Sequence, residues 1–98
     1  MAKKTYIYKG IKVWFSKNIY KKGGSMQLQM WCEDGPYATL TVNLSNGCAG
    51  KNLAYVDTNN YPWAPKFLEE KEIAENTGII GYSGYCSYPL YAFNMNKI

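Results

Sequence analysis

The 98-residue chain contains no histidine and no arginine. Without histidine, a catalytic triad would need a carboxylate as its general base. The three cysteines, Cys32, Cys48 and Cys86, form no Cys-x-x-Cys pair, so we expect free thiols, no metal site and no cofactor. Without arginine, the bidentate fork that matches guanine is missing, which argues against base-specific reading of nucleic acid.

Long hydrophobic runs are also absent. No apolar segment approaches the ~18–20 residues of a membrane-spanning helix, and the N-terminal MAKKTYIYKG lacks the apolar region of a secretory signal. We therefore expect no membrane association and a cytoplasmic location. The length predicts a single domain, residues 1–98, and a hydrophobic content of 47% indicates a folded protein.

Acidic residues are missing from the first 22 positions, whereas seven of the eleven lysines lie there. The net charge of +4 therefore hides a basic first segment and a mildly acidic remainder. Such a segment can attract phosphates or an acidic protein surface, or it can simply keep an edge strand soluble. The lysines concerned are Lys3, Lys4, Lys9, Lys12, Lys17, Lys21 and Lys22.

Alternation of apolar and polar residues predicts β-strands over most of the chain. The Asp34-Gly35 pair predicts a hairpin, and Pro89 favours an edge or strand-start position. The segment 62–74 is the one good helix candidate, whereas the glycine-rich segment 76–87 is expected to be irregular. Strands are expected at 5–9, 11–20, 26–32, 37–44, 53–58 and 88–95, with loops at 21–25 and 45–51. The pattern predicts an α+β fold, an antiparallel sheet of about five strands with one short α-helix packed on one face.

The alternation also divides the sheet into two faces. Two tryptophans among lysine, glutamine and threonine are typical of a surface that contacts a partner, since tryptophan combines a large area with an N–H group. The alternative is that the first strand or the C-terminal segment folds over both indoles. The aliphatic face carries Val13, Phe15, Leu28, Met30, Leu40 and Val42. The opposite face carries Lys12, Trp14, Gln27, Gln29, Trp31, Thr39, Thr41 and Asn43.

The stretch YVDTNNYPWAP, residues 55–65, places a carboxylate, a hydroxyl and two carboxamides side by side. Asp and Asn side chains bond nearby backbone N–H groups, so Asp57, Thr58, Asn59 and Asn60 suit a tight turn between a strand and a helix. A recognition role for the exposed part of the same loop is the alternative.

Four segments resemble one known family: PYATLTVNL, AYVDTNNYPWAPKFLEE, the Thr-Gly at 77–78 and SGYCSYPLY. The resemblance covers residues 36–93 and is to short domains of unknown function carried by phages and conjugative elements of bacteria. The family pattern contains TLTVNL, VDTNN-x-P-W, a short helix, Thr-Gly and SGYC-x-YPLY. One departure is Lys71-Glu72, where the family has Asn-Gly closing the helix. Another turn or a longer helix is expected to replace the usual left-handed cap.

The resemblance implies no enzymatic activity and an accessory role for a mobile element inside a bacterial cytoplasm. Accessory proteins of this kind often antagonise host defence, including inhibitors of CRISPR nucleases. The first hypothesis is therefore a non-enzymatic protein that binds and inhibits a host protein such as a defence nuclease. The residues expected to contact it are Lys12, Trp14, Gln27, Gln29, Trp31, Asn59 and Asn60.

Two other functions stay open. The seven N-terminal lysines, with Trp14 and Trp31 as a stacking platform, would suit single-stranded nucleic acid. A hydrolase would use Asp57 or Cys86, but no residue that would activate either is evident. Open strand edges also make a homodimer an expectation.

Overall fold

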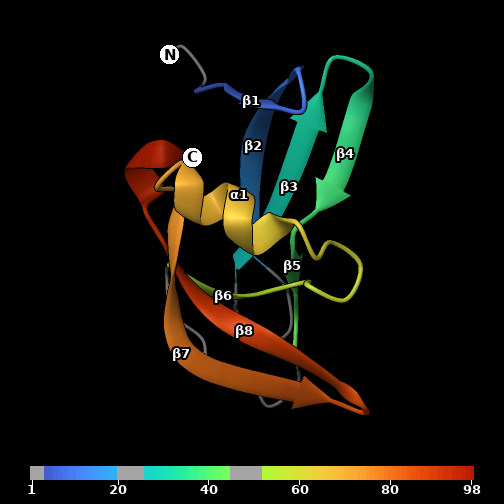
Figure 1. Ribbon diagram of the computed structural model, residues 1–98, viewed down its shortest axis with the longest axis vertical. Helices are drawn as coiled ribbons and strands as arrows, with labels where there is room; N and C mark the ends of the chain where they lie inside the picture. Colours follow the sequence, from blue (N-terminus) through green and yellow to red (C-terminus); the bar gives the residue numbers. More distant parts are fainter. Residues whose placement is uncertain (1–3, 20–25, 45–51) are drawn as a thin grey trace.

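The computed structural model describes residues 4–19, 26–44 and 52–98, and the structural statements below concern these residues. They form two four-stranded antiparallel sheets, one α-helix and one short 3-10 helix (Figure 1). The elements are β1 (Tyr6–Tyr8), β2 (Ile11–Ile19), β3 (Met26–Cys32), β4 (Gly35–Thr39), β5 (Thr41–Val42), β6 (Leu53–Val56), α1 (Ala64–Glu70), β7 (Ala74–Ser83), β8 (Cys86–Phe93) and η1 (Met95–Lys97). The first sheet has the order β1-β2-β3-β4, and the second has β5-β6-β8-β7.

The expected α+β class, with antiparallel strands and one short helix, is confirmed. The expected hairpin at Asp34-Gly35 is also present, since Cys32 pairs with Gly35 around a turn at residues 33–34. The expectation of one sheet with about five strands is wrong, because the described residues form eight strands in two sheets. The expected loops at 21–25 and 45–51 lie outside the described residues.

The chain passes from the first sheet to the second at Leu40. The Leu40 N–H donates to the Leu28 carbonyl (2.9 Å), and the Leu40 carbonyl accepts from the Asp57 N–H (2.8 Å). The next residue, Thr41, is buried, and its Oγ1 accepts from the Leu28 N–H at 3.1 Å. The segment 37–44 is therefore two strands instead of one, and Thr41 lies inside. Alternation misses this corner because it assigns a polar residue such as threonine to the exposed face. Here the threonine is buried, and its hydroxyl replaces a backbone carbonyl as the hydrogen-bond acceptor.

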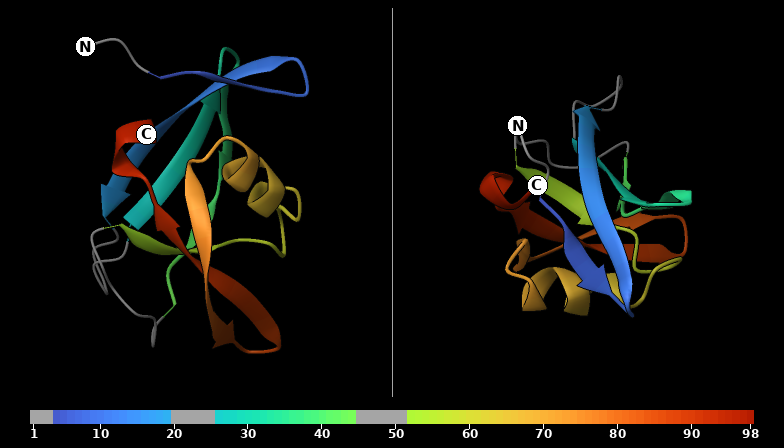
Figure 2. Two further views of the ribbon diagram at one scale, coloured as in Figure 1. Left: turned by 60° about the vertical axis from the view of Figure 1, so that its left-hand side comes forward. Right: turned by 90° about the horizontal axis from the view of Figure 1, so that it is seen from above.

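The helix α1 packs against the inner face of the first sheet (Figures 1 and 2). Phe67 of the helix contacts the rings of Tyr8 and Phe15, with centroids 5.4 and 6.3 Å away. Trp63, at the start of the helix, stacks on Tyr8 at 4.5 Å. Since aromatic pairs stabilise contacts beyond the area they bury, this cluster fixes the helix on the sheet. Beneath it, the predicted core residues Val13, Leu28, Met30 and Leu40 are fully buried, whereas Phe15 and Val42 are half-buried.

The helix ends at Glu70 and does not continue to residue 74 as expected. Glu72 adopts φ +57°, in the left-handed region that favours glycine. The Ile73 N–H then donates to the Leu68 carbonyl at 2.8 Å, which is the hydrogen bond of a Schellman ending. The expected replacement of the left-handed cap is therefore wrong. The cap is present, and a glutamate occupies it at a cost of about 1–2 kcal/mol.

The glycine-rich segment 76–87 is a hairpin, contrary to the expected irregular structure. Gly78, at φ +86°, lies in a bulge between Asn76 and Ile80, and Gly84, at φ +61°, opens the two-residue turn. Gly81 faces the Tyr55 ring so closely that a Cβ there would lie 2.6 Å from Tyr55 Cε1. The glycines in this segment thus permit regular strands where their number predicted a loop.

The last strand begins at Cys86, two residues before the expected start at residue 88. It lies between β6 and β7, yet β6 pairs only with Leu90, Tyr91 and Ala92. Pro89 therefore has a neighbouring strand on the β7 side alone. Its position agrees with the rule that proline avoids places where both sides of a strand are paired.

Replacement of Thr41 by valine should lower the free energy of unfolding by about 1–3 kcal/mol, because the buried Leu28 N–H loses its acceptor while side-chain volume is kept. Urea unfolding followed by tryptophan fluorescence measures the change. The control is Thr39→Val, whose hydroxyl bonds the half-buried Gln29 side chain and whose loss should cost about 1 kcal/mol or less. Equal costs for the two variants would contradict the assigned role of Thr41.

Replacement of Glu72 by glycine should raise the free energy of unfolding by about 1 kcal/mol, because it relieves the left-handed backbone. The matched control is Glu75→Gly, the same chemical change on the extended backbone of β7, which should destabilise by about 0.5–1 kcal/mol. In thermal and urea unfolding, the free energy of unfolding should rise for Glu72→Gly and fall for Glu75→Gly. A loss of stability in Glu72→Gly would refute the backbone strain at Glu72.

Candidate protein-binding face

Trp14 and Trp31 lie directly opposite each other on neighbouring strands β2 and β3. Their side chains have the parity opposite to that of the fully buried Val13 and Met30, so they project from the outer face of the first sheet. Both indoles are partly exposed, and neither belongs to the hydrophobic core or to the side chains packed on it. Among the described residues, the two indoles are therefore not part of the hydrophobic interior.

This outer face, called the tryptophan face below, extends over all four strands of the first sheet. Ile7 of β1 pairs with Lys12, which places an apolar side chain, 54% exposed, next to the predicted residues. Its members are Ile7, Lys12, Trp14, Ser16, Gln27, Gln29, Trp31 and Thr39. Sequence reasoning missed Ile7 and Ser16, although alternation in their strands would have identified both.

Polar groups on the tryptophan face are held by hydrogen bonds within it. The Trp31 indole N–H donates to Ser16 Oγ at 2.8 Å. Gln29 donates through Nε2 to the carbonyls of Ala38 and Met30, both at 3.0 Å, and its Oε1 accepts from the Thr39 hydroxyl. These bonds fix side-chain rotamers before any partner arrives, so less conformational entropy is lost on binding. Gln29 thus joins β3 to β4 and orders the surface.

Asn59 and Asn60 do not belong to the tryptophan face. They lie in the loop between β6 and α1, whose helix covers the other side of the first sheet (Figure 1). Asp57 is buried, and its carboxylate accepts from the Asn60 backbone N–H at 3.2 Å and from Asn60 Nδ2 at 2.9 Å. The Asp57 carbonyl also accepts from Tyr61 N–H at 2.9 Å. The expected turn role of this loop is confirmed, and both Asn59 and Asn60 are exposed.

The lysines proposed for nucleic-acid binding are spread around the described structure. Lys12 lies on the tryptophan face, but Lys17 pairs with Leu28 and has the parity of the inner face. Lys9 lies in the β1–β2 turn with its Nζ 5.5 Å from the centre of the Tyr8 ring, and Lys4 precedes β1. Lys3, Lys21 and Lys22 lie outside the described residues. The structure therefore places one described lysine, Lys12, beside the two indoles.

The two candidate catalytic residues contact neighbouring polar side chains. Cys86 contacts Tyr88, and desolvation, the hydrogen bond with Cys86 and the charge of Asp57 raise the pKa of Tyr88. The Asp57 carboxylate accepts hydrogen bonds from the backbone N–H and the side-chain amide of Asn60.

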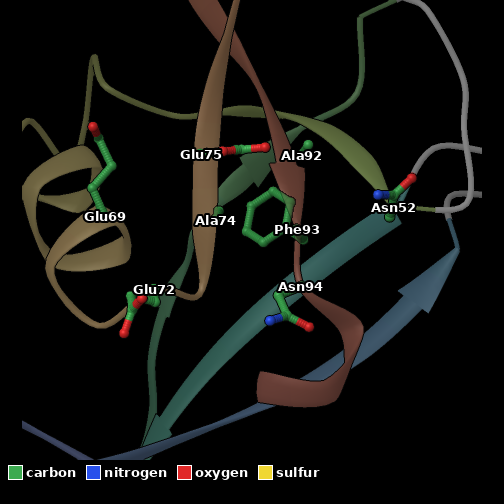
Figure 3. A pocket seen from close by; sticks show the side chains of 8 residues that line it. All are labelled: Asn52, Glu69, Glu72, Ala74, Glu75, Ala92, Phe93 and Asn94. Carbon is green, nitrogen blue, oxygen red and sulfur yellow. The ribbon is translucent and has the colours of Figure 1, made fainter.

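A surface depression of ≈ 550 Å³ lies between the end of α1, the start of β7 and the end of β8 (Figure 3). Glu69, Glu72 and Glu75 line it, but their carboxylates point in different directions (Figure 3). Glu69 also accepts from the Tyr91 hydroxyl at 2.7 Å, and burial together with this carboxylate raises the pKa of Tyr91. In the described parts of the chain, no cluster of carboxylates and thiols has the geometry to hold a metal ion.

Comparisons with known proteins identify a family but no characterised relative. Residues 16–98 match the family described as a domain of unknown function, DUF4313, and the chain belongs to this family. The expectation of a family of unknown function is thus confirmed, and the match begins earlier than the resemblance at residues 36–93. No curated protein and no solved structure matches the chain. Among the described residues, no helix has the length and apolar composition needed to cross a membrane.

Replacement of Asp57 by alanine should lower the free energy of unfolding by about 1–3 kcal/mol, because the Asn60 groups lose their acceptor. The control, Asn59→Ala in the same loop, should change stability by about 0.5 kcal/mol or less, since Asn59 is exposed. Urea unfolding of both variants measures the difference. A neutral Asp57→Ala variant would reopen the catalytic or recognition reading of this loop.

Proposed function

We propose that this member of the DUF4313 family is a non-enzymatic binding module that contacts a host protein through the tryptophan face. The cross-strand pair of Trp14 and Trp31, both partly exposed near Ile7 and with the Trp31 indole hydrogen-bonded to Ser16, carries the proposal. Buried tryptophans are frequent anchors of protein interfaces, and a rigid face loses little entropy on binding.

The class of partner follows from two further considerations. The resemblance to proteins of phages and conjugative elements favours a bacterial host protein in the cytoplasm, and defence nucleases are the class that such elements have reason to inhibit. Lys12 is the charged residue on the tryptophan face, so the face favours a partner whose contact surface is apolar with an acidic rim.

Nucleic-acid binding is the second candidate. A flat pair of indoles beside Lys12 could stack bases, and the basic N-terminal segment could add charge. The described lysines, however, do not line a continuous groove, because Lys17 and Lys9 lie away from the indoles. The geometry therefore favours a protein partner.

The W14A/W31A double variant should lose at least about tenfold in affinity for the partner, because hot-spot aromatics contribute about 2 kcal/mol or more. The assay is affinity capture from a bacterial lysate, followed by DNA cleavage by the captured or purified defence nucleases with each variant present. Y37A is the matched control, since Tyr37 is 38% exposed but its ring contacts Tyr8 and Trp63 beside the helix and not the two indoles. Unfolding curves confirm that each variant is folded.

Equal capture by wild type and W14A/W31A would overturn the tryptophan face as the contact site. A titration with single-stranded oligonucleotides at low and high salt separates the two candidate functions. Tight binding that weakens steeply with salt and is lost in W14A/W31A would favour nucleic acid over a protein partner.

A further inference from the structure

The hairpin of β7 and β8 extends beyond the rest of the second sheet as a two-stranded arm, residues 79–88 (Figures 1 and 2). Of the seven large hydrophobic residues that are exposed in the described parts of the chain, four lie on this arm. Ile79 is 52% exposed, Ile80 53% and Tyr82 72%, and Tyr85 at the tip is fully exposed. Such a concentration of apolar surface on one arm marks an interaction site.

The arm also lacks the charges that commonly protect sheet edges. No charged residue occurs between Glu75 and Lys97, although the chain carries a net charge of +4. β7 is the terminal strand of its sheet, so one side of its backbone faces outward. Sheet edges in proteins are commonly blocked by lysine or proline, and the outer part of β7 has neither.

The inner part of β7 is blocked by its bulge, and the outer part is not. In the bulge, the Gly78 N–H donates to Asn76 Oδ1 at 2.8 Å and the Ile79 N–H donates to Thr77 Oγ1 at 3.2 Å. From Ile80 to Ser83 the strand regains regular pairing with β8, so its other side presents an extended edge. One side of the strand at Gly81 packs closely against the Tyr55 ring, so the side chains of Ile80 and Tyr82 point to the other face.

We propose that residues 80–82 of β7 pair antiparallel with the same segment of a second copy of this chain, around a two-fold axis at Gly81. If the axis is perpendicular to the sheet, a side chain on one face of the first copy has its equivalent on the same face in the second copy. Two residues can therefore lie opposite each other only if their side chains point to the same face of the sheet. With the axis at Gly81, Ile80 of one copy lies opposite Tyr82 of the other, twice. Each such pair is a cross-strand contact of the type that stabilises sheets.

A second copy fits this edge better than an unrelated strand. The arm is apolar and carries no charged residue, so two arms meet without like-charge repulsion between their own side chains. At roughly 100–200 Å² for each exposed aromatic or branched side chain, the two arms would bury about 1,000 Å², near the lower limit for a specific interface. A dimer with a dissociation constant in the micromolar range is expected. The arm lies on the second sheet, so this proposal stands independently of the tryptophan face.

Sedimentation equilibrium of the full chain from about 1 to 200 µM tests the dimer. The wild-type mass should rise from 11.2 kDa toward twice that value, and the I80K variant should stay at 11.2 kDa over the range. The matched control is I7K, which changes an equally exposed isoleucine on β1 and should dimerise as wild type does. A monomeric wild type, or a dimer lost in I7K and kept in I80K, would overturn the proposal.

Mixing two variants tests the register. I80K alone and Y82E alone should both be monomers, whereas their equimolar mixture should form a heterodimer, because lysine and glutamate then lie opposite each other in one pair while the other pair stays native. The affinity of the mixture should exceed that of either variant alone by at least about tenfold. Circular dichroism confirms that both variants are folded. A mixture that stays monomeric would refute the axis at Gly81.

Discussion

The two backbone hydrogen bonds of Leu40 join the sheets of this protein. Its N–H bonds to Leu28 of β3, and its carbonyl bonds to Asp57 after β6. Thr41 adds a third bond by accepting from the Leu28 N–H, so the corner satisfies buried backbone groups that a turn in solvent would leave to water. Both sheets and α1 also share one hydrophobic core, so the corner and the core together fix the three layers on one another. The tryptophan face and the arm keep their positions only while both hold.

The corner also explains why one face of the first sheet stays uncovered. The second sheet and α1 both pack on the inner face, where Phe67 and Leu68 meet the side chains of β2 and β3. The described residues form no further layer over the outer face. That face keeps its regular pairing because the Gln29 amide and the Trp31 indole N–H are bonded within it. The partly exposed indoles are thus a stable feature of the folded protein.

Alternation predicted well which residues of the first sheet face the core. The strands β2 and β3 each have one buried face and one face toward solvent, and a period of two residues reports that difference directly. It failed at Thr41, where burial depends on a hydrogen bond to a distant residue. Glycine composition was the wrong guide at residues 76–87, where it predicted an irregular segment. In the structure, Gly78 lies in a bulge, Gly81 lies against the Tyr55 ring and Gly84 lies in the turn of a hairpin. The tryptophan pair was predictable, but its separation from Asn59 and Asn60 required the path of the chain in space.

The two proposed surfaces would act together without competing for the same residues. The tryptophan face belongs to β1–β4, and the arm belongs to β7 and β8, which extend from the opposite end of the molecule (Figure 1). A two-fold dimer through the arms would present two tryptophan faces at a fixed separation. Two linked faces raise the effective concentration for a partner with two sites, so an individually weak contact could hold a dimeric or repetitive target. A small chain with one flat face would in this way reach an avidity that its own surface area does not allow.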